Sequence, residues 1–280
     1  MRVLIPGANG MVARAVIDGC EDANDQVFTV DRNALDISDT AAVFDLFDRI
    51  RPEVVINTAA WTDVDGCESD IERAYAVNAR GPANLAVGCR RIGAGLVTVS
   101  TDYVFDGAHD GFYTQRDDPR PLSVYGESKL DGERQAQAAN ARTIIVRTGW
   151  VFGPHGRNFL SVMGDKLKRG EPVRAIDDAI GTPTYAMDLA ARLRELAMLD
   201  LPGIYHVANA GDGVSYFEYV QELARAVGAD PALVTGNPMR DVMRPAPRPH
   251  NSRLQCLLSP VLGLAPLPPW QESLRKFVAG

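Results

Sequence analysis

Short runs of apolar residues alternate with segments of helical periodicity along the first half of the chain. The apolar runs cover residues 2–6, 26–31, 54–60, 96–105 and 143–151. Short apolar runs of this kind are typical of parallel strands that are buried on both faces. Between two of the runs, apolar residues recur at the spacing of one helix face: Ala41, Val43, Phe44, Phe47 and Ile50. This alternation predicts an α/β fold with a doubly wound parallel sheet.

The pattern becomes less regular after about residue 152. Helical periods cover residues 158–169, 187–199 and 216–227, and a short strand-like run, GIYHVAN, precedes the last of them. Proline-rich loops follow at residues 244–249 and 266–269. We therefore expect a sheet domain over residues 1–152 and a smaller C-terminal substrate-binding lobe over residues 153–280. A boundary near residue 152 also allows part of residues 153–280 to return to the sheet domain.

Composition and charge narrow the classes of partner. The chain has 280 residues, of which 46% are hydrophobic and 23% charged, as in ordinary globular proteins. A formal net charge of −7 argues against a nucleic-acid partner. The apolar N-terminal run is too short for a signal peptide or a membrane span. The cysteines, which show no metal-site spacing, are Cys20, Cys67, Cys89 and Cys256. We expect a cytoplasmic monomer or homodimer without a metal and without a nucleic-acid or membrane partner.

A glycine-containing turn directly follows the first predicted strand, with Gly7 and Gly10 in the segment GANGMVA. Glycines let the backbone approach a pyrophosphate, and a helix N-terminus attracts its negative charge. Asp31 ends the second strand, where a carboxylate can bind ribose hydroxyls, and the neighbouring Arg32 can pair with a 2′-phosphate. The pattern predicts a Rossmann-type domain that binds NADPH or NADH, with a weak preference for NADPH. Taken alone, it also fits a plain turn with a solvated Asp31.

Three polar residues are candidates for catalysis. Tyr125 and Lys129 lie in the segment YGESK and share one side of a helix. The ammonium would stabilise a phenolate and lower the pKa of the tyrosine, although the same spacing also fits an ordinary surface pair. Thr101 lies in the segment STDYVF at the end of the fourth strand, where ligands of such sheets bind. We expect Thr101 and Tyr125 to share a developing oxyanion while a nicotinamide delivers hydride.

These ordered elements resemble the extended branch of the short-chain dehydrogenase/reductase superfamily, in which Asn78 matches a residue that supports the active-site lysine. Seven segments are similar to successive segments of the dTDP-4-dehydrorhamnose reductase family: VVINTAAWTDVDGCE, STDYVFDG, PLSVYGESKLDGE, RTGWVFGPHGRNF, DDAIGTPTYAMDLA, GIYHVAN and RPAPRPHNSRL. The resemblance covers nearly the whole chain. It implies that NAD(P)H reduces the C4 ketone of dTDP-4-dehydro-L-rhamnose to dTDP-L-rhamnose. Tyr125 would be the proton donor, Lys129 its modulator and Thr101 the partner of the carbonyl.

The resemblance also implies which residues contact the ligands. Those expected to contact the cofactor are Gly10, Met11, Val12, Asp31, Asp36, Ile37, Ala60, Trp61, Thr62, Tyr125 and Lys129. Thr101, Asp102 and Trp150 are expected to contact the substrate. In the C-terminal lobe, aromatic rings and arginines suit a nucleotide sugar, with ordinary packing or solvated charge as the alternative. The residues expected there are Asn158, Phe159, Arg244 and Arg253.

Two features depart from the family pattern. Ala13 replaces the more usual third glycine, and Trp61 replaces a smaller ring, which leaves the fit around the pyrophosphate and the nicotinamide open. The side chains of Met11, Val12 and Ile37 can equally belong to the core, with backbone contact only.

Two other functions compete with the reductase. One is an NAD-dependent nucleotide-sugar epimerase or dehydratase of the same superfamily, which tightly bound NAD would favour. The other is a non-catalytic regulatory subunit like that of methionine adenosyltransferase. The intact set of Thr101, Tyr125 and Lys129 argues against the regulatory subunit, because binding alone does not need a proton donor.

Overall fold

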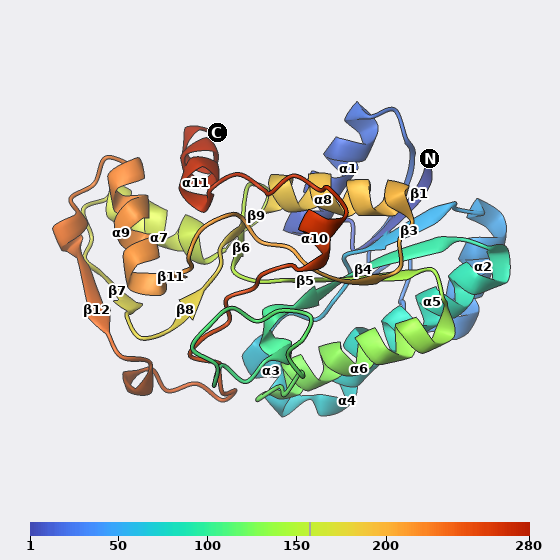
Figure 1. The fold of residues 1–280 in the computed structure, drawn as a ribbon, viewed down its shortest axis with the longest axis horizontal. Coiled ribbons are helices and arrows are strands. Elements are labelled where there is room, and N and C mark those ends of the chain that lie inside the picture. The colour runs from blue at the N-terminus through green and yellow to red at the C-terminus, as the bar shows by residue number, and fades with distance from the viewer. Residues whose placement is uncertain (157) are drawn as a thin grey trace.

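A six-stranded parallel β-sheet forms the centre of the protein (Figure 1). The computed structural model describes residues 1–156 and 158–280. The strand order is β10-β5-β4-β3-β1-β2, and all neighbouring strands are parallel. The strands are β1 (Arg2–Pro6), β2 (Gln26–Val30), β3 (Val54–Asn57), β4 (Gly95–Thr101), β5 (Thr143–Thr148) and β10 (Gly203–His206). The predicted Rossmann-type α/β fold is confirmed.

Helices cover both faces of this sheet. Val3 and Ile5 of β1 pack into one apolar cluster with α1 and α8, whereas Leu4 between them packs into a second cluster with α2 and α5. Because both faces are buried, the strands are apolar at successive positions rather than at alternate ones. The helices are α1 (Met11–Asp22) and α8 (Ala186–Leu199) on one face, and α2 (Thr40–Ile50), α5 (Gly81–Ile92) and α6 (Val124–Ala139) on the other (Figure 1).

Several strands end before the apolar runs that predicted them. β4 ends at Thr101, whose side chain accepts a hydrogen bond from the Tyr103 amide at 3.1 Å and starts the 3₁₀ turn η2 (Asp102–Val104). β5 ends at Thr148, and Trp150 then adopts a φ of 50° in the turn before β6 (Val151–Phe152). Polar side chains that bond the local backbone favour such turns over continued strand. The loops that begin here leave the sheet at its carboxyl edge.

After β3, the chain runs through three short helices before α5. They are α3 (Val64–Ser69), α4 (Ile71–Tyr75) and the π-helix η1 (Ala76–Arg80). π-Helical turns are rare and occur mostly at functional sites.

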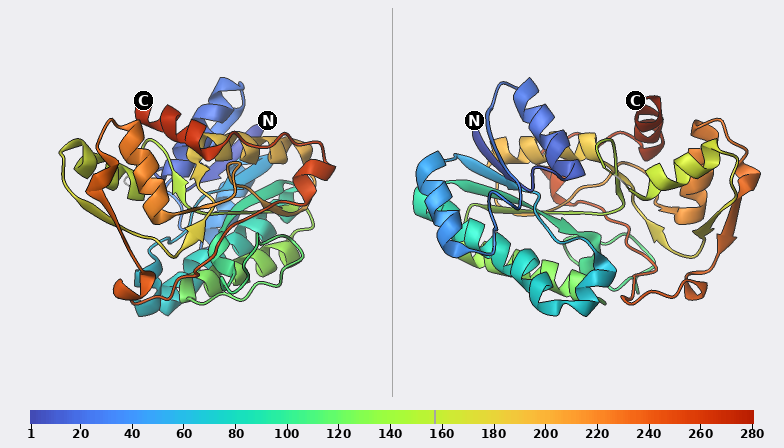
Figure 2. Two further views of the ribbon diagram at one scale, coloured as in Figure 1. Left: turned by 60° about the vertical axis from the view of Figure 1, so that its left-hand side comes forward. Right: turned by 180° about the vertical axis from the view of Figure 1, so that it is seen from behind.

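A smaller lobe of helices and short strands packs beside the sheet (Figure 2). Its apolar core gathers around Tyr219 and includes Phe152 and Trp270. Its strands are β6, β7 (Val173–Ile176), β8 (Ile180–Gly181), β9 (Thr184–Tyr185), β11 (Val214–Ser215) and β12 (Val234–Asn237). Its main helices are α7 (Phe159–Lys168), α9 (Tyr216–Ala226) and α11 (Trp270–Ala279), and its short turns are η3 (Pro231–Leu233) and η4 (Met239–Asp241). The short helix α10 (Leu258–Val261) instead lies beside α8, where Leu258 packs against the apolar cluster of α1 and α8 (Figure 1).

The chain passes between the two parts more than once. α8 and β10 follow residue 152 in the sequence, yet α8 packs on α1 and β10 pairs with β5. No helix within the described ranges has both the length and the apolar character that a membrane span requires.

Candidate active site

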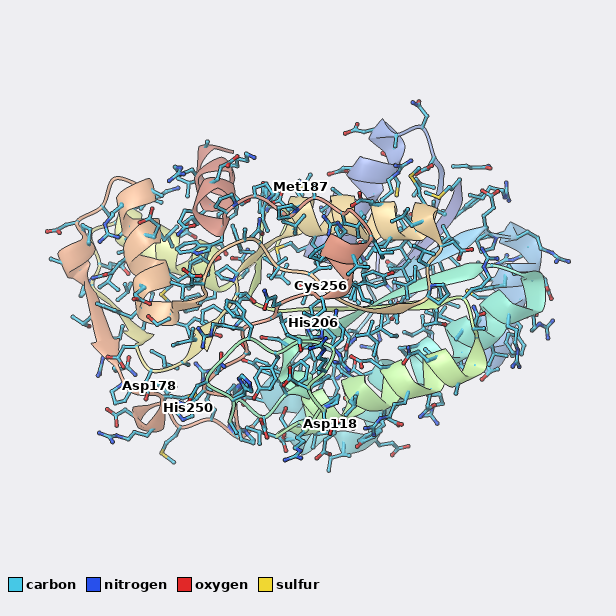
Figure 3. The ribbon with its side chains drawn as sticks, in the orientation of Figure 1. Asp118, Asp178, Met187, His206, His250 and Cys256 are labelled. Carbon is cyan, nitrogen blue, oxygen red and sulfur yellow. The ribbon has the colours of Figure 1, made fainter. Side chains whose placement is uncertain are left out.

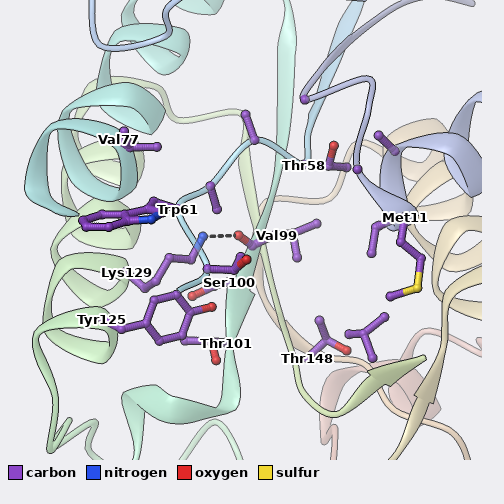
Figure 4. A pocket seen from close by; sticks show the side chains of 18 of the residues that line it. Met11, Thr58, Trp61, Val77, Val99, Ser100, Thr101, Tyr125, Lys129 and Thr148 are labelled. Atoms are coloured by element: carbon purple, nitrogen blue, oxygen red, sulfur yellow. Dashed lines mark hydrogen bonds between the residues drawn. The ribbon is translucent and has the colours of Figure 1, made fainter. Parts of the chain in front are cut away.

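A cavity of about 670 Å³ opens at the carboxyl edge of the sheet (Figure 4). The loops that follow β1, β2, β3, β4 and β5 line it from the sheet, and Tyr216 of α9 lines it from the smaller lobe. Ligands of open parallel sheets bind at this edge, where the loops of neighbouring strands meet.

The glycine turn after β1 forms one end of the cavity. Gly7 has a φ of 88°, and a Cβ on this residue would lie 2.9 Å from the backbone of Ala59, so both the conformation and the space require glycine. Gly10 precedes α1 without a side-chain cap, which leaves the first amide groups of the helix available to an anion. Met11, Val12 and Ala13 continue the cavity wall. The turn therefore fits the pyrophosphate of a dinucleotide.

Asp31 and Arg32 differ in their access to this cavity. Arg32 is exposed and lines the cavity, as do Asp36 and Ile37. The carboxylate of Asp31 accepts hydrogen bonds from the amides of Asn33 and Ala34 at 3.0 Å each and from Asn9 Nδ2 at 3.1 Å. The structure places Arg32, but not Asp31, among the residues that line the cavity.

Ala60, Trp61 and Thr62 line the middle of the cavity. The Trp61 amide donates to Asn78 Oδ1 at 2.8 Å, and Asn78 Nδ2 donates to the Trp61 carbonyl at 3.0 Å. Asn78 also donates to the hydroxyl of Ser128 on α6 at 3.2 Å. Its contacts therefore join the Trp61 loop to the neighbour of Lys129 rather than to the lysine itself.

Tyr125 and Lys129 lie in the first two turns of α6, on the side that faces β4. The Ser123 side chain caps this helix by accepting a hydrogen bond from the Gly126 amide. At Gly126, a Cβ would overlap the carbonyl oxygen of Tyr103, so glycine allows α6 to approach η2 closely. Tyr125 and Lys129 are both buried, with 9% and 5% of their surfaces exposed.

Burial sets the protonation of both groups. It raises the pKa of Tyr125 well above its ordinary value, against the opposing effect of a side-chain hydrogen bond with Thr101. It also lowers the pKa of Lys129 from 10.5 to about 8, and the carboxylate of Glu133 opposes this. The Lys129 ammonium donates to the carbonyl oxygen of Val99 at 2.6 Å (Figure 4). The lowered pKa that we expected for the tyrosine is therefore not found, because desolvation outweighs the other influences and the ammonium is directed at Val99.

Thr101 and Asp102 complete the polar wall beside Tyr125. Thr101 Oγ1 donates to Asp102 Oδ1 at 3.0 Å. Within the part of the chain that the structure describes, Asp102 Oδ2 has no hydrogen-bond partner, although this residue is only 3% exposed. Burial raises the pKa of Asp102 to about 6, and the hydrogen bond from Thr101 opposes this. A buried acceptor that lacks a partner favours a ligand that carries a hydroxyl or an amide.

The cavity thus joins a glycine turn for a dinucleotide to a tyrosine, a lysine and a threonine around one position. Residues 1–280 match the sequence profile of the family described as RmlD substrate binding domain. The chain belongs to this family.

Individual relatives agree with this membership. The dTDP-4-dehydrorhamnose reductase of Mycolicibacterium smegmatis is 39% identical over 281 residues, which cover 99% of this chain and 85% of that protein. The crystal structure of dTDP-4-dehydrorhamnose reductase from Bacillus anthracis in complex with NADP superimposes with a TM-score of 0.95 at 33% identity, over 99% of this chain and 98% of that one. The UDP-glucose 4-epimerase of Thermus thermophilus in complex with NAD has a TM-score of 0.86 at 25% identity, over 100% and 98% of the two chains.

The family resemblance seen in the sequence is confirmed. Trp150 lines the cavity, as do two tyrosines that were not expected from the sequence, Tyr103 and Tyr216. The rings of Trp150 and Tyr216 stack with centroids 3.6 Å apart and planes 15° apart. Tyr103 lies edge-on to Tyr125 at 6.2 Å. Tyr103 directly follows Asp102, so the segment STDYVF contained a signal for it. Tyr216 begins α9, and no local motif connects it with Trp150.

Asn158 and Arg253 lie outside the cavity wall. Asn158 caps α7 by accepting a hydrogen bond from the Ser161 amide at 3.0 Å, and it donates to the Gly153 carbonyl at 3.0 Å. Arg253 Nε donates to Asn251 Oδ1 at 3.0 Å, and its guanidinium lies 5.1 Å from the ring centroid of Phe112. The structure shows contacts of both side chains within the protein, and their contacts with a nucleotide sugar stay a prediction.

Two histidines, His206 and His250, also lie away from the site, whereas His155 lines the first cavity. The ring of His206 is buried in the interior near Cys256, with Nδ1 3.0 Å from the Tyr113 carbonyl (Figure 3). His250 lies at one edge of the molecule beside Asp178, whose carbonyl is 3.1 Å from its Nδ1 (Figure 3).

A second cavity of about 510 Å³ adjoins the first, because Tyr216 lines both. Two arginines, Arg174 of β7 and Arg244, face it together with aromatic and aliphatic side chains. The other lining residues are Phe159, Met163, Ala175, Ile176, Asn237, Asp241 and Val242.

Proposed function

We propose that the chain is an NADPH-dependent reductase that converts the C4 ketone of dTDP-4-dehydro-L-rhamnose to the alcohol of dTDP-L-rhamnose. One observation carries the proposal: the hydroxyls of Thr101 and Tyr125 share a cavity with the glycine turn (Figure 4). The names of the relatives, and the NADP complex of one of them, support the reaction and the cofactor.

When bound, NADPH supplies the hydride for the ketone carbon. The side chains of the protein supply the proton and stabilise the charge. The raised pKa of Tyr125 keeps its phenol protonated at neutral pH, so the phenol can donate its proton to the carbonyl oxygen. The Thr101 hydroxyl donates to Asp102 Oδ1 in the protein without ligands. When it turns to the substrate it becomes a second donor to the same carbonyl oxygen, and this hydrogen bond strengthens as negative charge develops there.

Lys129, which lies one helical turn after Tyr125 on α6, balances that negative charge. Its ammonium is held by the Val99 carbonyl at 2.6 Å, and the same group lies where it can bind a ribose hydroxyl of the cofactor. Arg32 lines the adjoining wall and is the candidate partner of the 2′-phosphate that distinguishes NADPH from NADH. The carboxylate of Asp31 is held by three hydrogen bonds from the protein and opposes a 2′-phosphate, so the preference for NADPH depends on Arg32.

The cavity offers the substrate one polar contact and one flat aromatic surface. Asp102 Oδ2, which no donor among residues 1–156 and 158–280 reaches, is the candidate acceptor for a sugar hydroxyl, and Trp150 offers a face for the apolar side of a deoxysugar ring. The nucleotide would then extend into the second cavity, where Arg174 and Arg244 suit its phosphates and Phe159 suits a base.

The direct test is to incubate the purified protein with NADPH and a panel of 4-keto nucleotide sugars, and to follow the loss of nicotinamide absorbance. We expect turnover with the dTDP-linked 4-keto-6-deoxy sugar and less with its UDP-linked counterpart. Arg244→Ala should raise KM for the nucleotide sugar and leave the affinity for NADPH unchanged. No turnover with any 4-keto sugar, together with NAD that copurifies with the protein, would instead support the epimerase or dehydratase.

A further inference from the structure

Three charged or polar side chains form a buried cluster around Glu133, one helical turn after Lys129 on α6. Arg147 of β5 makes a two-pronged ion pair with Glu133 of α6: Nε lies 3.0 Å from Oε1, and Nη2 lies 2.6 Å from Oε2. The hydroxyl of Ser100 on β4 donates to the same carboxylate. The side chains of Arg147 and Glu133 are only 4% and 3% exposed. The catalytic reaction as described uses none of these three side chains.

The cluster is adjacent to the catalytic residues on two elements. On α6, Tyr125, Lys129 and Glu133 are spaced four residues apart and all three are buried. On β4, Ser100 lies between Val99, whose carbonyl accepts the bond from Lys129, and Thr101. Glu133 thus accepts a hydrogen bond from Ser100, which lies on β4 between Val99 and Thr101. Ser100 and Arg147 are also direct partners in the β4–β5 register.

Burying an ion pair is not needed for stability at this point. Two apolar side chains of similar volume often stabilise a protein as well or better. A buried carboxylate beside a catalytic lysine therefore suggests a role toward that lysine. The Lys129 ammonium is itself buried, and Glu133 is the carboxylate whose charge favours it.

We propose that Glu133 is a positioning residue, which fixes α6 against β4 through Ser100 and supplies the negative charge that balances the buried ammonium of Lys129. This inference rests on the proposed function for its catalytic consequence, but the charge balance itself is a property of the protein without ligands. Arg147 holds the carboxylate in place.

Other titratable groups also pack around α6, and Glu133 has to be distinguished from them. They come from α3, α4, α5, η2 and β5, and from α6 itself: Cys67, Glu68, Arg73, Tyr75, Cys89, Asp102, Tyr103, Arg147, Tyr125 and Glu127. Glu127 is a matched control for Glu133, because it is a glutamate on the same helix but is exposed to solvent. Its charge is screened by water, whereas that of Glu133 is not.

The lysine content of the chain makes a direct measurement practical. The sequence holds four lysines, Lys129, Lys166, Lys168 and Lys276, and the last three are exposed or half-buried. In protein labelled with ¹³C at the lysine ε-carbon, four resonances can be followed against pH in the absence of ligands. The Lys129→Met variant identifies the resonance of Lys129.

We expect Lys129 to titrate near 8 in the unmodified protein, and about one pH unit lower once the charge of Glu133 is removed. Glu133→Gln keeps the shape of the side chain but leaves Arg147 without its counter-charge, and this variant can fail to fold. The variant Glu133→Gln/Arg147→Met buries no charge in the cluster, and an unbranched methionine follows the path of the arginine stem. Glu127→Gln should leave the titration unchanged.

A Lys129 titration that is the same in the folded double variant as in Arg147→Met, which lacks the guanidinium but keeps the carboxylate, would overturn the proposal. An equal change in Glu127→Gln would also overturn it. A second arm measures kcat for the keto sugar against pH. Activity that needs the ammonium falls as pH rises through the pKa of Lys129, so the alkaline limb should move to lower pH by the same amount as the resonance. A limb that stays in place while the resonance moves would refute the catalytic role of Glu133. If the unmodified protein reduces no keto sugar, the proposed function fails, and the titration still decides the charge balance.

Discussion

Thr101 donates a hydrogen bond to Oδ1 of Asp102 at 3.0 Å, while Oδ2 of this buried carboxylate has no partner among the residues that the structure describes. The same threonine oxygen accepts a bond from the Tyr103 amide. Thr101 therefore holds the turn η2 in shape and orients the carboxylate, in addition to the role toward the substrate carbonyl that we propose for it.

Replacing Thr101 separates these roles. Thr101→Val should lower kcat by about 10²–10³ because it removes a donor to the developing oxyanion. It should also lower the melting temperature, since the cap of η2 is lost. Thr101→Ser keeps the hydroxyl and should retain much of the activity. Rates, melting temperature and NADPH affinity are measured together, and a Val variant as fast as the native enzyme would remove Thr101 from the catalytic set.

Asp102 gives a prediction about pH and stability. Burial raises its pKa from 3.8 to about 6, so the folded protein holds this proton more tightly than the unfolded chain does. Ionising the group therefore destabilises the fold: the cost is absent below 3.8, grows between 3.8 and 6, and is complete above 6. At 1.36 kcal/mol per pKa unit, this cost is about 3 kcal/mol.

Asp102→Asn should therefore unfold at a higher urea concentration than the native protein when the pH is well above 6, and show no such gain below 3.8. The same variant should raise KM for the keto sugar, because an acceptor oxygen in the cavity is lost. Urea unfolding at two pH values makes the measurement. A gain that does not depend on pH would show that the carboxylate is not the source.

Tyr125→Phe tests the proton donor. Only the hydroxyl is removed, and the ring keeps its place in the apolar cluster with Cys67 and Ala74. We expect turnover to fall almost completely and the affinity for NADPH, measured by fluorescence titration, to stay about the same. A variant that keeps most of its kcat would show that another group donates the proton.

Asp31→Asn addresses the choice of cofactor. An asparagine can still accept the two bonds from the amides of Asn33 and Ala34, so the turn should survive, but the negative charge next to Arg32 is lost. The ratio of kcat/KM for NADPH to that for NADH should rise by several-fold, because a carboxylate repels the 2′-phosphate. Arg32→Ala is the paired variant and should move the ratio in the opposite direction. If the NADPH-to-NADH ratio of kcat/KM is the same in both variants, the 2′-phosphate lies away from Asp31 and Arg32.

The local parts of this protein could be predicted from the sequence. The apolar runs defined the strands because both faces of the sheet are buried. Gly7 could be placed because its turn requires a positive φ and leaves no room for a Cβ. Tyr125 and Lys129 could be paired because a helix places residues four apart on one side.

Strand ends were predicted less well. A run of apolar residues does not reveal that the side chain of Thr101 ends β4 by bonding to the backbone of Tyr103. The expected lowering of the tyrosine pKa was wrong for a related reason. Burial is a property of the packed protein, and it outweighed the ammonium that sequence spacing had placed nearby.

Contacts between distant segments were decided by the tertiary structure alone. Arg253 suits a diphosphate by its chemistry, and only the packed structure shows that it also contacts Asn251 and Phe112. Trp150 stacks on Tyr216, and Glu133 pairs with Arg147, although no motif links the members of either pair. The sequence determined which backbone conformations and helix faces were possible, because those depend on neighbours along the chain. The fold decided which charges and rings face the cavity, because burial and pairing depend on neighbours in space.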